Sequence, residues 1–200
     1  MSDQYTVMPL FLLTLVSRGG LNTLYALQHQ AGLQPGGVQP VLRQLERDGL
    51  LLRSEEGKRR RRAMVVTDKG EETLAAHWRT CLGFYIDVES VLRAATTSLL
   101  MGDQKAAYHY LLNVADDYQR RSSGPHAGHP DHRASLTDWY AYVRAKWETA
   151  RLQSAAETLR TIARTIDGSA EFRPTKSLLP ADGAVEGDQL RVPVRSERAP

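Results

Sequence analysis

The chain contains one cysteine, Cys81, among its 200 residues. An intrachain disulfide and a zinc site built from several cysteines are therefore both excluded. This composition fits a reducing compartment, and we expect the protein to be cytoplasmic. Cys81 stands close to Trp78, Leu82 and Phe84, so we interpret it as a core residue. A redox sensor whose thiol pKa is lowered by the nearby Arg79 is the alternative.

Long apolar runs are also missing. The apolar stretch at 7–16 is about half as long as the roughly 20 residues that a transmembrane helix needs, and no basic residue precedes it. It therefore predicts neither a membrane span nor a signal peptide. Apolar residues nevertheless make up 42% of the sequence, which is enough to form a packed core.

Patterns typical of catalytic sites are absent as well. The sequence shows no set of nucleophile, base and orienting residue, no glycine-rich phosphate loop and no paired carboxylates. We therefore expect no enzymatic activity and no cofactor. The histidines His126, His129 and His132 lie three residues apart, but Pro125 and Pro130 interrupt any regular helix through them. We interpret this segment as a polar loop and expect no metal site. A metal site is the alternative interpretation of the histidine spacing.

Positive charge is concentrated in one place. The net charge is only +3, yet Lys58, Arg59, Arg60, Arg61 and Arg62 follow one another without interruption. Five adjacent cations repel each other, and a polyanion would relieve this repulsion while releasing its own counterions. The run therefore favours nucleic-acid binding over the alternative of a solvated loop.

The first part of the chain predicts three helices, a hairpin and a fourth helix. The predicted elements are helices at 8–17, 21–31 and 38–48, strands at 50–54 and 62–67, and a helix that starts near Lys69. Pro35, Gly36 and Gly37 are expected to break the chain before the third helix, with Pro40 in its first turn. Thr67 and Asp68 are candidate N-cap residues of the fourth helix.

The second part is predicted to be helical. Its predicted elements are a helix at 70–100 that bends at Gly83, a helix at 104–121, a loop at 122–133 and a helix at 135–166. Ser135 or Thr137 is expected to cap the last helix. Residues 168–200 are rich in proline, glycine and charge, and we interpret them as a poorly ordered tail.

Two apolar stripes follow one another along the helix at 135–166. The first is Leu136, Tyr140, Val143, Trp147 and Ala150, and the second is Leu152, Ala156, Leu159, Ala163 and Ile166. The shift between them resembles a stutter between two coiled-coil segments. We interpret the aromatic residues as core or dimer interface. A ligand pocket lined by Trp139, Tyr140, Tyr142 and Trp147 is the alternative.

Three helices followed by a basic hairpin are typical of a winged helix-turn-helix. The third helix would enter the major groove, and the hairpin would lie along the backbone or in the minor groove. Gln39 and Gln44 are candidates to read adenine, and Arg43 is a candidate for guanine or phosphate. Including the residues expected to contact phosphate, the predicted DNA-binding residues are Gln39, Pro40, Arg43, Gln44, Arg47, Arg53, Lys58, Arg59, Arg60, Arg61 and Arg62.

Three segments, 9–15, 36–50 and 66–70, resemble the PadR family of transcriptional regulators. The middle segment reads GGVQPVLRQLERDGL, and the last reads VTDKG. The family's tyrosine before the proline is Gln39 here, and the usual Gly-Tyr of the second helix is Leu24-Tyr25. The resemblance implies a homodimeric repressor or activator that is in some cases controlled by a ligand.

We therefore expect a mainly α protein with three regions: a winged-helix domain at 1–75, a helical dimerisation region at 76–167, and the tail. Its expected function is that of a sequence-specific transcriptional regulator, most simply a repressor, that binds a palindromic double-stranded operator. A small-molecule effector is a further candidate partner. The rival interpretation is a winged-helix module that binds another protein and no specific DNA.

Overall fold

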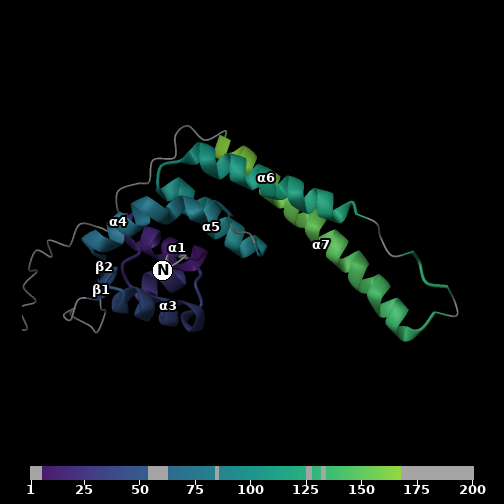
Figure 1. The fold of residues 1–200 in the computed structure, drawn as a ribbon, viewed down its shortest axis with the longest axis horizontal. Helices are drawn as coiled ribbons and strands as arrows, with labels where there is room; N and C mark the ends of the chain where they lie inside the picture. The colour runs from purple at the N-terminus through teal and green to yellow at the C-terminus, as the bar shows by residue number, and fades with distance from the viewer. Residues whose placement is uncertain (1–5, 54–62, 84–85, 125–127, 132–133, 168–200) are drawn as a thin grey trace, which may run out of the picture.

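The computed structural model describes residues 6–53, 63–83, 86–124, 128–131 and 134–167. Within them the fold is mainly helical with one two-stranded antiparallel sheet (Figure 1). In chain order the elements are α1 (Val7–Ser17), α2 (Leu24–His29), α3 (Pro35–Arg47), β1 (Leu51–Arg53), β2 (Met64–Val66), α4 (Asp68–His77), the 3₁₀ helix η1 (Trp78–Gly83), α5 (Val88–Leu100), α6 (Gln104–Ser122) and α7 (Leu136–Asp167). This order is compatible with the predicted winged helix.

Helix α1 lies at the centre of the N-terminal half. Its sequence is apolar on all sides, and a helix of this kind is stable only when the rest of the fold surrounds it. Every residue from Leu10 to Val16 is buried, and α3, α4, α5 and β2 all pack against the helix. The one polar residue in that stretch, Thr14, donates a hydrogen bond from its hydroxyl to the carbonyl of Leu10 at 2.7 Å.

Helix α3 begins three residues earlier than the sequence predicted. The Pro35-Gly36-Gly37 segment was expected to be a break, but it forms the first turn of the helix. Proline suits this position because the first amide of a helix has no intrahelical acceptor. As a consequence, Pro40 lies inside α3 and not in its first turn.

The hairpin is shorter than predicted. The paired residues are Leu51 with Val66, Leu52 with Val65 and Arg53 with Met64, so the observed strands occupy the middle of each predicted range. Residues 54–62 lie outside the described part of the chain. At the base of the hairpin, the amide of Met64 donates to the carbonyl of Asn22 at 2.7 Å. The hairpin is thereby attached to the loop between α1 and α2.

The predicted single helix at 70–100 is wrong. Helix α4 ends at His77, η1 follows, and α5 starts only at Val88. The side chain of Asp87 accepts a hydrogen bond from the amide of Ser90, and the Ser90 hydroxyl accepts from the amide of Asp87. This capping box specifies a new helix start. The buried residues Trp78 and Cys81 continue the apolar pattern through η1, so periodicity alone did not reveal the interruption.

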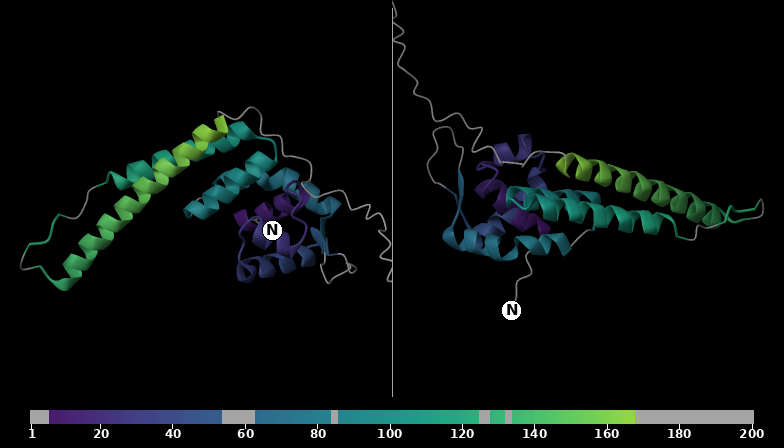
Figure 2. Two further views of the ribbon diagram at one scale, coloured as in Figure 1. Left: turned by 180° about the vertical axis from the view of Figure 1, so that it is seen from behind. Right: turned by 90° about the horizontal axis from the view of Figure 1, so that it is seen from above.

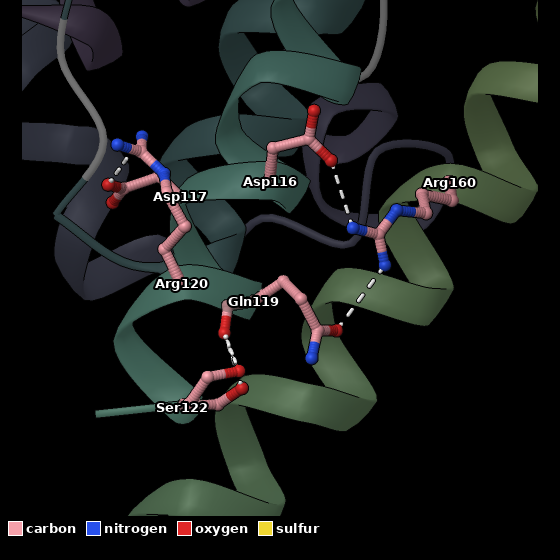
Figure 3. A network of polar contacts seen from close by, with 7 residues as sticks. Asp116, Asp117, Gln119, Arg120, Ser122 and Arg160 are labelled. Atoms are coloured by element: carbon pink, nitrogen blue, oxygen red, sulfur yellow. Dashed lines mark hydrogen bonds and ion pairs between the residues drawn. The ribbon is translucent and has the colours of Figure 1, made fainter. Parts of the chain in front are cut away.

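Helices α6 and α7 form an antiparallel pair, and α6 packs against α5 (Figures 1 and 2). The cap predicted at Ser135 is present, since its hydroxyl accepts from the amide of Asp138 at 3.2 Å. Between the two helices, Arg160 of α7 donates to the carboxylate of Asp116 at 2.9 Å, beside the amide of Gln119 (Figure 3). Only the C-terminal half of α7 packs on α6, and the N-terminal half extends beyond the end of α6 (Figure 2).

Candidate nucleic-acid interface

Helix α3 has one buried face and one exposed face. Val38, Leu42 and Leu45 are buried against the core. Helical spacing places Pro40, Arg43, Gln44 and Arg47 together on the opposite side, and all four are exposed. Gln39 lies at the margin between the faces and is partly buried. The structure thus brings four of the predicted DNA-binding residues into one stripe and leaves Gln39 beside it.

The first turn of α3 adds two residues that the sequence interpretation missed. Gly36 and Gly37 are exposed, and a Cβ atom built on either would meet nothing within 4 Å. Both lie on the same side of the helix as Pro40. Backbone without side chains allows a close approach by another molecule. Proline at the first helical position was the signal that could have identified this turn as helical.

Two of the stripe residues already have partners. The amide nitrogen of Gln44 donates to both carboxylate oxygens of Asp48, at 2.8 and 3.0 Å, and its oxygen accepts from Arg47. For Arg43 the structure shows no ion pair or hydrogen bond within the described ranges. Arg43 could therefore bind a ligand without breaking a contact to any described residue, whereas Gln44 would have to exchange its bonds to Asp48.

Arg53 lies differently from the residues of α3. Its guanidinium pairs with the carboxylate of Glu46, and both side chains are partly buried. Glu46 lines a shallow hollow together with Pro40, Arg43 and Arg47. An unpaired carboxylate in this hollow would repel a phosphate, so the ion pair with Arg53 neutralises a charge that would oppose the binding of a phosphate group.

The pair allows two roles for Arg53 to be separated. If Arg53 acts through Glu46, Arg53→Ala should weaken DNA binding and Glu46→Gln should restore most of the loss. The physical reason is that removing the carboxylate also removes the repulsion. Binding of both single variants and the double variant to one duplex, by fluorescence anisotropy, measures this coupling. Equal losses for Arg53→Ala with and without Glu46→Gln would instead indicate a direct phosphate contact.

The cationic residues Lys58, Arg59, Arg60, Arg61 and Arg62 lie outside the described residues, so their role remains a prediction. Hydrogen bonds connect the base of this hairpin to the neighbouring elements. The hydroxyl of Thr67 donates to the carbonyl of Gly49 at 2.7 Å and accepts from the amide of Gly70 at 3.0 Å. Lys69 also donates from its Nζ to the carbonyl of Asp48 at 2.7 Å. The C-terminal end of α3, β2 and the start of α4 are therefore joined.

The other candidate sites have different outcomes. Cys81 is fully buried, and burial raises the pKa of its thiol to about 11, so the prediction of a core cysteine is confirmed.

His129 contacts the rings of Trp139 and Tyr142, each at a centroid distance of 5.2 Å. His126 and His132 lie outside the described residues. Among the residues that the structure describes, no three metal-binding side chains come together.

No helix in the described ranges is long and apolar enough to cross a membrane. Comparisons of the chain with protein-family models, curated proteins and solved structures find no match. The resemblance to PadR regulators therefore rests on the sequence motifs alone.

Proposed function

We propose that the protein is a homodimeric, sequence-specific DNA-binding regulator of transcription, and most simply a repressor. Helix α3 would lie in the major groove, and the hairpin at 50–67 would lie on the backbone or in the minor groove. The observation that carries the proposal is the exposed stripe of Pro40, Arg43, Gln44 and Arg47 on a helix whose other face is buried. A rigidly seated helix with polar residues on its outer face is what major-groove recognition requires.

The arrangement supports a division of roles. Arg43 has no partner among the described residues, and a free guanidinium can donate two hydrogen bonds to guanine. Arg47 lies one turn further on, nearer the end of the helix, where a phosphate contact is the simpler role. Gly36 and Gly37 would let the first turn approach the groove edge closely. The sequence preference would therefore come mainly from Arg43, with Gln39 and Gln44 as additional contacts.

The partners follow from this proposal. A two-fold dimer matches a palindromic double-stranded operator, since each copy then meets one half-site. The resemblance to PadR regulators supports the dimer and leaves room for a small-molecule effector. Binding, without catalysis, is the whole of the proposed activity.

The experiment is a selection of bound sequences from a random DNA pool, followed by affinity measurements on the selected and altered sites. Arg43→Ala should lower the preference for the selected base at one position by about 10- to 100-fold, as the loss of one good base contact would. Arg79→Ala is the matched control, because Arg79 is an exposed arginine outside α3. A uniform loss of affinity on all sequences after Arg43→Ala would contradict base reading.

A second candidate is a winged-helix module that binds a protein. It is favoured by the bonds that tie Gln44 to Asp48 and Arg47, which keep part of the α3 surface occupied. A gel shift with DNA from upstream of its own coding region separates the two candidates. Failure to select any sequence from the random pool would favour the protein-binding module.

A further inference from the structure

Helix α7 carries two apolar faces, and within the described part of the chain only one of them is covered. In the C-terminal half, Leu152, Ala156, Leu159 and Ala163 are buried on α6. In the N-terminal half, the exposed fractions are 87% for Leu136, 66% for Tyr140, 58% for Val143 and 60% for Trp147. Large apolar side chains gathered at one helical stripe are unusual on a free surface and indicate an interface.

The two faces lie on nearly opposite sides of α7. At about 100° of rotation per residue, the exposed face is turned by roughly 160° from the buried one. It is therefore not a continuation of the α6 contact, and a longer α6 would not cover it. Among the described residues of the loop before α7, His129 contacts Trp139 and Tyr142, which lie beside this face and not on it. Figure 2 shows this half of the helix extending away from the rest of the fold.

We propose that a second copy of the chain covers this face, and that the two α7 helices pack antiparallel through Leu136, Tyr140, Val143 and Trp147. The inference rests on the homodimer of the proposed function and assigns its interface. The spacing of these four residues, 4-3-4, is that of the a and d positions of a coiled coil. A two-fold axis between residues 141 and 142 brings the face of one copy onto the same face of the other.

The side chains that this two-fold axis brings together from the two copies are complementary in size. Leu136 of one copy meets Trp147 of the other, and Tyr140 meets Val143. Each large ring is thus opposed by a smaller aliphatic side chain, and the four layers fill similar volumes. A parallel pair would oppose Trp147 to Trp147 and Val143 to Val143, which leaves one layer crowded and another open.

The charges on the flanks of the face favour the same orientation. Arg144 and Arg151 lie on one flank, and Lys146 and Trp139 lie on the other. In a parallel pair, Lys146 of one copy would face Arg151 of the other, which is repulsive. In the antiparallel pair, Lys146 lies near Trp139 of the other copy, where a cation can contact an aromatic ring.

The size of the face sets the expected strength of the dimer. The exposed parts of the four side chains amount to on the order of 500 Å² per copy, given about 150–250 Å² for an aromatic side chain. A stable interface usually buries about 800 Å² per partner, and the stems of Arg144 and Lys146 supply part of the difference. We therefore expect a dissociation constant on the order of micromolar, with a palindromic operator holding the two copies together at lower concentrations.

Sedimentation equilibrium of the full chain tests the interface. The unmodified protein should form dimers, and Val143→Glu should raise the dissociation constant about 100-fold or more, because it places an unpaired charge in the seam. Ala141→Glu is the matched control, since it adds the same charge two residues away on another side of α7 and should leave the dimer intact. A monomer at all concentrations would overturn the proposal, and so would equal effects of the two variants.

Cross-linking tests the orientation. Mild oxidation of a mixture of Leu136→Cys and Trp147→Cys proteins should give a mixed disulfide dimer, because these positions meet only in the antiparallel pair. Dimers that form only between identical variants would overturn the antiparallel arrangement.

Binding of the Val143→Glu variant and of the unmodified protein to a single selected DNA half-site is measured alongside. If Val143→Glu is monomeric and still binds the half-site, the interface and the DNA-binding function both hold; dimerisation without any DNA binding would leave the interface and remove the proposed function.

Discussion

Replacing Lys58 and Arg59–Arg62 with alanine is expected to weaken binding to every duplex, whatever its sequence. Each cation that contacts a phosphate releases a condensed counterion, so the slope of log K against log salt should fall by about 0.9 for each such cation that is replaced. If all five cations contact phosphates, the slope should flatten by roughly 4.5. Binding isotherms on a selected operator and on an unrelated duplex, between low and physiological salt, measure the change.

A control must separate a local effect from the change in net charge. A second variant loses five cations on the helices beyond the hairpin: Arg79, Lys105, Arg120, Arg121 and Arg164. All five are exposed, and none belongs to α3 or to the hairpin. The control should change the slope little, because charges separated from the DNA by more than about 10 Å are screened at ordinary salt. A slope that is unchanged in the first variant, or equally flattened in both, would rule out the wing assignment.

Helix α3 shows which features the sequence could predict and which it could not. The spacing of the apolar residues Val38, Leu42 and Leu45 is helical, and all three are buried on one face of α3. The start of the helix was not predicted, because proline and two glycines disfavour a helix interior and resemble a loop. At the first turn these preferences cost little, since the amides there have no intrahelical acceptor. The proline and the two glycines therefore resembled a loop, because composition alone does not show that they occupy the first turn of a helix.

The second part of the chain shows a different limit. Apolar periodicity reports which side chains are buried, and it does not report which hydrogen bonds the backbone makes. Cys81 was correctly predicted to be buried although it lies in a 3₁₀ helix within a range predicted to be α-helical. The stripe from Leu136 to Trp147 was interpreted as core or dimer interface; its side chains are exposed, so the core interpretation is wrong and the interface remains a proposal. The sequence could not show which of the two stripes of α7 is covered by α6, because that depends on the tertiary packing of the two helices.

Gly70→Ala is expected to destabilise the fold strongly. In an exposed helix this change stabilises by about 1 kcal/mol. Here a Cβ atom on Gly70 would lie 2.2 Å from the carbonyl oxygen of Leu50 and 2.6 Å from Cγ1 of Val66. Neither neighbour can yield easily, because the Leu50 carbonyl accepts from the amide of Thr67 at 3.1 Å. We expect a loss of about 3 kcal/mol, at the upper end for overpacking, and a melting temperature lower by about 6–12 °C.

The same substitution at Gly36 is the matched control, because Gly36 also lies in the first turn of a helix. Nothing lies within 4 Å of a Cβ atom at that position, so Gly36→Ala should stabilise the protein by up to about 1 kcal/mol. The two variants differ only in what surrounds the added methyl group, and thermal unfolding by circular dichroism should shift in opposite directions. Equal shifts would contradict the close packing of α4 on Leu50 and Val66 at the base of the hairpin. Opposite shifts would identify Gly70 as the point where α4 packs closely on the base of the hairpin.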